Sequence, residues 1–186
     1  IIDLFSRKVI AYKISKKNST QLITATFKMA YEERNPPTGL IFHSNRGAQY
    51  TSHRFQQLLH EHKVQQSFSR PGEPYDNAVA ESFFASLKKE ELYRRNITSD
   101  RAFQASVASY IEFYNTKRPH RTLKNLTPCQ MEEAAVQLLN ETSVFESPNL
   151  LVFYYVLRRF VFSCLIFASA RHSLKSLSYQ DFQDIK

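Results

Sequence analysis

Short apolar runs alternate along this chain with longer stretches whose apolar residues recur at helical spacing. The clearest run is 40–42, which follows two prolines and a glycine and ends in a polar triplet at 43–45. Three apolar residues between turn residues are too few for a helix, so the pattern predicts a buried strand. Residues 64–68, which begin with Val64 and end with Phe68, are a second short strand candidate. Strands that alternate with helices indicate one mixed α/β domain.

The remaining elements follow from local spacing and capping residues. Residues 1–15 are rich in Ile, Val, Tyr and Phe but are interrupted by Ser6-Arg7-Lys8, which predicts a hairpin. Apolar spacing after capping residues predicts helices. They are expected at residues 20–33, from Ser52 onward, from Asp76 or Asn77 to about Tyr93, and at 99–115. The aromatic side chains of the last two helices are expected to pack between them as core: Phe83, Phe84, Tyr110 and Tyr114.

The charge balance indicates a polyanionic partner. The chain has 25 Lys and Arg against 17 Asp and Glu, a formal net charge of +8, and such an excess favours nucleic acid or an acidic membrane surface. Two cysteines, Cys129 and Cys164, lie far apart and in no metal-ligand spacing, so neither a disulfide framework nor a zinc site is expected. No signal peptide is recognisable at the start, and a reducing cytoplasm is the simpler setting.

Two segments carry the residue types that divalent-metal chemistry needs. Polynucleotidyl transfer uses two hard cations, which are held by carboxylates on rigid elements. One segment is His43-Ser44-Asn45-Arg46-Gly47-Ala48-Gln49-Tyr50, directly after the predicted strand. The other is Asp76-Asn77-Ala78-Val79-Ala80-Glu81-Ser82-Phe83-Phe84, at the start of a predicted helix. Asn45 and Glu81 are therefore the residues to compare with metal-binding acids.

Together these segments resemble the signature of OrfB-type insertion-sequence DDE transposases, whose integrase catalytic core is shared with retroviral integrases. The family pattern is H-S-D-R-G-x-Q-Y followed by D-N-A-x-x-E-S-F-F, with 35 residues between the Asp of the first motif and the Glu of the second. The resemblance begins at Ile2-Asp3-Leu4-Phe5-Ser6-Arg7, continues to the motifs at 114–123 and 127–128, and covers about residues 1–135. It implies a ribonuclease-H-like α/β fold, Mg²⁺ or Mn²⁺ as cofactor, and DNA cleavage and strand transfer on transposon ends and target DNA.

The resemblance also implies that the metal site is degenerate. Glu81 matches the third acid of the family, and Asn45 stands where the second acid is expected. The first acid should lie on a first strand that would precede Ile1, so the fold is expected to lack that strand. Asp3 matches a second-strand acid that is not a ligand. A turn residue and a solvated helix-start acid are the alternatives for Asn45 and Glu81. We expect no catalysis and no stable metal binding.

Several basic residues are candidates for phosphate contacts, which position DNA without reading its sequence. Lys88 lies two helical turns after Glu81 and therefore on the same helix face, and by resemblance this position contacts the terminal DNA. The full set of candidate DNA-binding residues is Arg46, Arg70, Lys88, Lys89, Lys117, Arg118, His120 and Arg121. Solvated surface charge is the alternative for each one.

The chain is expected to divide into a catalytic core at 1–135 and a C-terminal extension at 136–186. The extension contains an apolar stretch, 150–170, split by Arg158-Arg159, which is no membrane span. A buried helix or strand pair and a non-native extension are equal alternatives for it. Without a first strand, an unpaired sheet edge should make folding marginal.

Three functional hypotheses follow: a transposase core inactive in this chain, a non-catalytic DNA-binding or oligomerising remnant, and a decayed mobile-element product without function. A bacterial cytoplasmic protein that forms homo-oligomers is expected, with no membrane partner and no small-molecule substrate.

Overall fold

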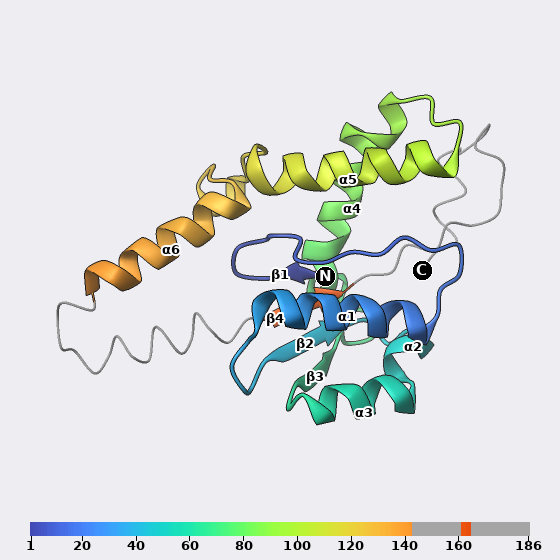
Figure 1. The fold of residues 1–186 in the computed structure, drawn as a ribbon, viewed down its shortest axis with the longest axis vertical. Coiled ribbons are helices and arrows are strands. Elements are labelled where there is room, and N and C mark those ends of the chain that lie inside the picture. The colour runs from blue at the N-terminus through green and yellow to red at the C-terminus, as the bar shows by residue number, and fades with distance from the viewer. Residues whose placement is uncertain (143–160, 165–186) are drawn as a thin grey trace.

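A computed structural model describes residues 1–142 and 161–164 of the chain (Figure 1). Its helices and strands follow one another as an alternation of short strands and longer helices, as the sequence predicts. In chain order they are β1 (Ile2–Asp3), α1 (Thr20–Arg34), β2 (Ile41–Ser44), α2 (Ala48–Thr51), α3 (His53–Glu61), β3 (Gln65–Phe68), α4 (Ala78–Glu90), α5 (Asp100–Thr116), α6 (Pro128–Thr142) and β4 (Val161–Cys164). Three short 3₁₀ helices lie at Pro74–Asn77, Leu92–Arg94 and Arg121–Leu123.

The four described strands form one sheet in the order β1-β4-β2-β3. β2 runs parallel to β3, with Ile41 opposite Gln65 and Ser44 opposite Phe68. β4 runs parallel to β2 and antiparallel to β1. β4 therefore occupies a central position in the described sheet, between β1 and β2.

Two hydrophobic clusters pack around this sheet. The first joins α1, α2 and α3 to β2, and its largest fully buried side chains include Phe27, Phe42 and Tyr50. The second joins β1 to α4 and α5. Ile1 belongs to the first cluster and Ile2 to the second, as expected when successive side chains of a strand point to opposite faces.

The aromatic residues of α4 and α5 pack between the two helices, as the sequence predicts. The rings of Phe83 and Tyr114 meet edge to face, with centroids 4.9 Å apart. Phe83, Tyr110 and Tyr114 are all buried. In Figure 1, α5 crosses α4 above the sheet, and α6 extends away from both.

Serine caps set the start of two of the predicted helices, α1 and α5. The hydroxyl of Ser19 accepts a hydrogen bond from the backbone N–H of Leu22, and α1 ends at Asn35 in the left-handed conformation. The hydroxyl of Ser99 accepts from Ala102 at the start of α5. Each bond satisfies a backbone donor that the first helical turn leaves unpaired.

Other local predictions were wrong in detail. Ser52 makes no capping bond, because its hydroxyl donates to the carbonyl of Gln49, and it separates the short α2 from α3. The helix expected over 76–93 is α4 flanked by two 3₁₀ helices. The expected N-terminal hairpin has the right backbone pairing, with a bridge between Ile2 and Val9, but only β1 is a regular strand.

A partly buried polar network holds α6 against the N-terminal segment and α1. Glu132 of α6 accepts hydrogen bonds from Lys8 at 2.8 Å and from the hydroxyl of Ser6 at 3.0 Å, and it forms an ion pair with Arg34. Arg34 also lies 3.6 Å from the carboxylate of Asp3. Burial raises the pKa of Asp3 to about 6, although hydrogen bonds from Phe5 and Ser6 and the charge of Arg34 lower it.

The C-terminal extension is represented by the end of α6 and by β4. α6 continues through the boundary expected at residue 135. Most of the apolar stretch at 150–170, and everything after residue 164, lies outside the described residues. An unpaired sheet edge at the place of the first strand was expected, but β4 pairs with both strands there. Among the helices described, none combines the length and the apolar character needed to cross a bilayer.

Candidate functional site

The motif around Asn45 lies at the C-terminal end of β2. β2 and β3 are parallel and end together, because the backbone N–H of Ser69 donates to the carbonyl of Ser44 at 2.9 Å. Asn45 follows directly and is half-buried. Its side-chain oxygen accepts a hydrogen bond from the backbone N–H of Gly47 at 3.1 Å. Asn45 thus shapes the turn between β2 and α2, while its amide oxygen carries no formal charge.

His43 is a residue of this site for which the sequence suggested no individual role. Its two ring nitrogens lie 3.0 Å from the hydroxyl of Ser67 and 3.1 Å from that of Ser69. The ring therefore ties the end of β2 to the end of β3. The only sequence signal was the position of His43 inside the motif, because the two serines lie 24 and 26 residues further along the chain.

The loop between β3 and α4 is fixed by Asp76. Its carboxylate accepts from the backbone N–H of Arg70 at 3.0 Å and from the Arg70 guanidinium at 3.2 Å. These hydrogen bonds, with smaller contributions from the charges of Arg70 and His43, lower the pKa of Asp76. The capping role expected for Asp76 was wrong. Asn77 occupies the N-cap position of α4 but makes no capping bond with its side chain.

Glu81 lies in the first turn of α4 and is exposed. The buried face of that helix is made by Ala80, Phe83 and Leu87, so Glu81 takes part in none of the hydrophobic packing. The chain reaches it from the end of β3 through the loop and 3₁₀ helix that span residues 69–77. Asn45 and the loop that leads to Glu81 therefore both begin at the same ends of the parallel strands. That the two side chains lie close together stays a prediction.

The residues at these strand ends do not fit a pair of divalent cations. In the part of the chain that the structure describes, no group of three or more His, Cys, Asp or Glu side chains is placed to hold a metal. β4, which lies beside β2, has the sequence Val-Phe-Ser-Cys and so contributes no acid. No Asp or Glu occurs anywhere in 147–180. Mg²⁺ and Mn²⁺ prefer several oxygen ligands with negative charge, and this set supplies too few.

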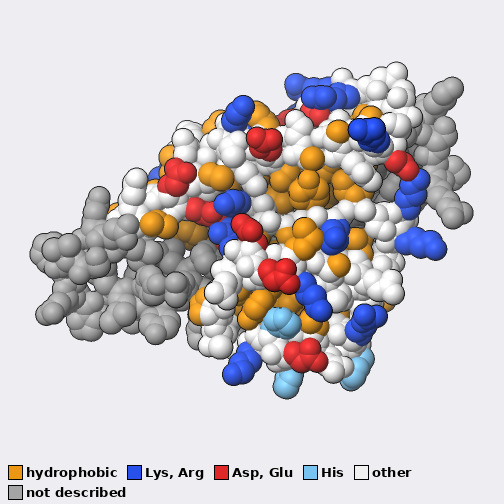
Figure 2. All heavy atoms as spheres, in the orientation of Figure 1, with side chains coloured by type: hydrophobic (Ala, Val, Ile, Leu, Met, Phe, Trp, Pro, Cys, Tyr) orange, Lys and Arg blue, Asp and Glu red, His pale blue; other side chains and the backbone are white. Residues whose placement is uncertain are grey.

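The candidate DNA-contacting residues fall into an exposed group and a packed group. The exposed ones are Arg46, Arg70, Lys89, Lys117 and Arg121. Arg70 is exposed but paired with Asp76. On the face seen in Figure 2, Lys and Arg side chains are spread over the surface and do not gather in a single patch.

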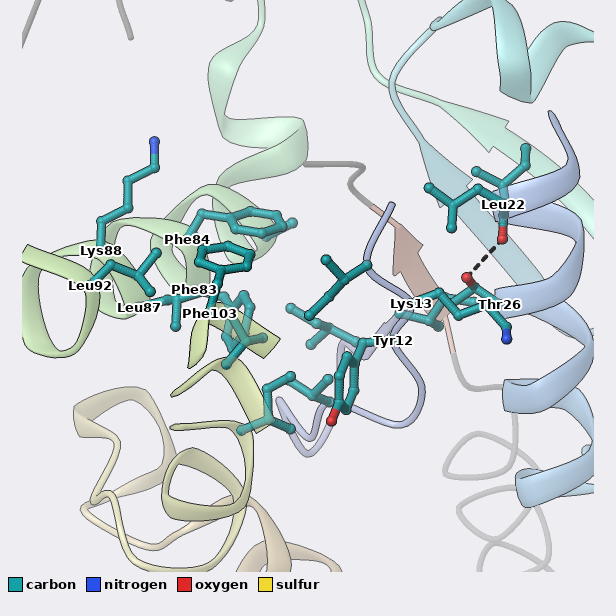
Figure 3. A pocket seen from close by; sticks show the side chains of 18 residues that line it. Tyr12, Lys13, Leu22, Thr26, Phe83, Phe84, Leu87, Lys88, Leu92 and Phe103 are labelled. Carbon is teal, nitrogen blue, oxygen red and sulfur yellow. Dashed lines mark hydrogen bonds between the residues drawn. The ribbon is translucent and has the colours of Figure 1, made fainter. Parts of the chain in front are cut away.

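Lys88 is partly buried and belongs to neither the exposed nor the packed group. Its side chain is among those that line an apolar cavity of about 100 Å³ between the N-terminal segment, α1, α4 and α5. In Figure 3 its stem lies beside Leu92 while its ammonium group points away from the cavity. Burial lowers the pKa of Lys88. This placement is typical of a lysine that covers apolar surface and keeps its charge near water.

Arg118 and His120 belong to the packed group. The guanidinium of Arg118 donates two hydrogen bonds to the carboxylate of Glu90, at 2.6 and 2.8 Å. The buried ring of His120 meets the ring of Tyr114 edge to face at 4.4 Å. Burial, and then the charge of Arg118, lower the pKa of His120. Both residues have structural partners within the protein, and a contact of either side chain with DNA stays a prediction.

Two family models described as integrase core domain match residues 1–74 and 62–128. The matched region therefore runs from β1 to the start of α6. It includes Asn45, Glu81 and every basic candidate named above.

Curated relatives include several transposases of insertion sequences. The chain is 38% identical to the putative transposase InsK of IS150 from Escherichia coli, over 70% of this chain and 46% of that protein. It is 38% identical to the transposase of IS904 from Lactococcus lactis, over 71% and 53%. The transposase InsF of IS3A from E. coli is 40% identical, over 71% and 46%. The chain spans about half the length of these relatives.

Solved structures show the same fold at low identity. The HTLV-2 integrase catalytic core domain in complex with magnesium is 19% identical and superposes with a TM-score of 0.52, covering 70% of this chain and 80% of that one. The catalytic core domain of BIV integrase is 17% identical, with a TM-score of 0.51 over 68% and 77%. The fold is thus ribonuclease-H-like, as expected, and the chain belongs to the integrase-core family of insertion-sequence transposases.

Proposed function

We propose that this chain is a transposase core that retains DNA binding but neither cleaves nor joins DNA. The observation that carries the proposal is the ligand set at the ends of β2 and β3. Asn45 stands at the family's second acid position, and its amide oxygen already accepts the N–H of Gly47. Glu81 is exposed on the following helix. One carboxylate and one amide supply too little negative charge for two dications.

The strand beside β2 supports the same conclusion. In an integrase core the first acid is expected on the strand next to the second acid. Here the described neighbour of β2 on that side is β4, with no Asp or Glu. Restoring the acid at position 45 alone therefore still leaves the site short of one ligand.

A strand-transfer assay tests the loss of catalysis. The full chain is incubated with labelled DNA that carries the ends of its own element, in the presence of Mg²⁺ or Mn²⁺. A full-length relative with its own ends is the positive control. We expect no cleaved or joined product from this chain. Metal-dependent product that disappears in Glu81→Gln would contradict the proposal.

DNA binding is tested separately, by filter binding over a range of salt concentrations. Binding through phosphate contacts releases condensed counterions, so the logarithm of the affinity should fall linearly with the logarithm of the salt concentration. Affinity that is absent at low salt, or that does not change with salt, would remove DNA binding from the proposal. The two assays are independent, because a chain can fail one and pass the other.

A further inference from the structure

We propose that the turn at 6–8 and the segment after α5 form a second DNA-binding surface, in which Arg7 contacts a phosphate group of duplex DNA. The proposal rests on the DNA binding proposed above and places part of it at the end of the sheet opposite to Asn45. The basic side chains of this surface are the half-buried Arg7 and the exposed Lys117 and Arg121. The sequence motifs did not single out Arg7 as a DNA-contacting residue.

Asn115, at the end of α5, fastens the two parts of the surface together. Its side-chain oxygen accepts a hydrogen bond from the backbone N–H of Val9 at 2.9 Å, and its side-chain nitrogen donates to the carbonyl of Val9 at 3.0 Å. The amide thus pairs with Val9 as the backbone of an adjacent strand would. Arg7 lies two residues before Val9. Lys117 lies two residues after Asn115, so one contact anchors both basic residues.

Both parts belong to stretches of the chain that contain no acid. No Asp or Glu occurs at 4–31 or at 117–131. In the second stretch, Arg118 is paired with Glu90. Arg7 takes part in none of the ion pairs formed among the described residues. Basic side chains without nearby acids attract a polyanion, because each phosphate that they neutralise releases condensed counterions.

The charge of Arg7 acts on the buried rings beside the segment after α5. Burial raises the pKa of Tyr114 to about 12, although the charges of Arg118 and Arg7 lower it. Burial, then the charge of Arg118, lower the pKa of His120, and the charge of Arg7 acts in the same direction. Glu90 acts in the opposite direction on both rings. Two guanidinium groups against one carboxylate leave this region with the positive charge that a phosphate contact requires.

The register of the sheet places this surface away from Asn45. β1 is antiparallel to β4, so the chain leaves β1 after Asp3 toward Val161 and Ile41, at the N-terminal ends of β4 and β2. Asn45 follows Ser44 at the other end of β2. In Figure 1 the N-terminal turn and the connection between α5 and α6 lie to the left of β1, whereas α2, which follows Asn45, lies to the right. The two ends of the sheet can therefore contact separate stretches of DNA.

Binding of a short labelled duplex to the full chain, over a range of salt concentrations, tests the role of Arg7. Arg7→Ala removes one charge, and the backbone φ of 63° strains alanine no more than arginine. The salt slope should fall by about 0.9 for the phosphate that is no longer neutralised, and Arg7→Lys should restore it. The matched control is Arg101→Ala, an exposed arginine of α5 about 21 Å along the helix from Asn115.

The control should leave the slope unchanged. Equal slopes in Arg7→Ala and Arg101→Ala would overturn the second surface while leaving DNA binding by the chain in place. Absence of DNA binding by the chain without substitutions would instead remove both the second surface and the proposed function on which it rests.

A chemical footprint on the chain without substitutions does not depend on the folding of any variant. Phenylglyoxal reacts with accessible guanidinium groups, and mass spectrometry identifies the arginines that it has modified. We expect duplex DNA to slow the modification of Arg7 severalfold and to leave that of Arg101 unchanged. An equal rate at Arg7 with and without DNA would overturn the proposal.

Discussion

Arg118 and Glu90 form a two-point ion pair between the segment after α5 and the end of α4, with N–O distances of 2.6 and 2.8 Å. Glu90 also accepts a hydrogen bond from the hydroxyl of Tyr110 at 2.9 Å. Both charged side chains are less than a third exposed. The pair therefore links α4, and through Tyr110 also α5, to the segment after α5. That segment carries the basic residues Lys117, Arg118, His120 and Arg121.

The first prediction concerns the stability that this pair provides. Arg118→Ala leaves the Glu90 carboxylate half-buried with Tyr110 as its remaining partner, so it should lower the free energy of unfolding by about 1–3 kcal/mol. Arg118→Lys keeps the charge but not the planar fork, so it should recover only part of that stability. Urea unfolding monitored by circular dichroism measures both. A stability of Arg118→Ala equal to that of the unmodified chain would show that the pair contributes nothing.

The same pair predicts a pH dependence. The hydrogen bond from Arg118, followed by that from Tyr110, outweighs burial and lowers the pKa of Glu90 below the ordinary value of 4.5. A lowered folded-state pKa gives stability that is present above pH 4.5 and is lost as the pH falls through the folded-state value. The difference in stability between the unmodified chain and Glu90→Gln should therefore shrink as the pH is lowered from about 5 to about 3. A difference that stays constant over this range would contradict the assignment.

The second prediction separates DNA contacts from packing. Lys117 and Arg121 are exposed in the segment between α5 and α6, in contrast to the paired Arg118. Lys117→Ala combined with Arg121→Ala should weaken DNA binding and reduce the salt slope by about 0.9 for each phosphate that is no longer neutralised. Stability should change by less than about 0.5 kcal/mol per substitution. Lys28→Ala, an exposed lysine of α1, is the control for removal of charge alone, and an equal effect from it would argue against a specific DNA-binding surface.

The third prediction concerns Asp3, which is fully buried. Its folded-state pKa of about 6 lies above the ordinary 3.8, so protonation stabilises the fold. That contribution is fully present below pH 3.8 and is lost as the pH rises through 6. It should decrease by about 1 kcal/mol between about pH 5 and pH 7. Asp3→Asn keeps an oxygen that accepts from Phe5 and Ser6 and should abolish this decrease, as urea midpoints at the two pH values will show. An unchanged pH dependence in the variant would assign the effect to another group.

Helices α1, α3, α4 and α5 and the parallel strands β2 and β3 were predictable because their signals are local. Ser19 and Ser99 cap helices whose apolar residues follow within one or two turns. The short run at 40–42 lies between turn residues and has room for nothing longer than a strand. In each case the physical cause lies within a few residues of the element that it determines.

The rest depends on partners that are distant in the sequence. Glu90 lies 28 residues from Arg118, and no local pattern shows that this basic residue is paired. Glu132 lies 124 residues from Lys8, so the network that holds α6 has no sequence signature. β4 pairs with strands that lie far earlier in the chain, which is why a sheet with an open edge was expected. The motif located Asn45 and Glu81, but it did not reveal which neighbours their side chains have.

The last prediction concerns Asn45→Asp. A carboxylate oxygen can accept the N–H of Gly47 as the amide oxygen does, so the turn after β2 should be kept and stability should change by less than about 0.5 kcal/mol. The substitution raises the number of acids at the two motif positions from one to two, and β4 still contributes none. Because two cations need further negative oxygen ligands, we expect no strand transfer by the variant with Mg²⁺ or Mn²⁺. Calorimetric titration with Mn²⁺ should likewise show no tight site. Joined product from Asn45→Asp that disappears in the double variant with Glu81→Gln would show that two acids suffice in this chain and that the amide alone had silenced it.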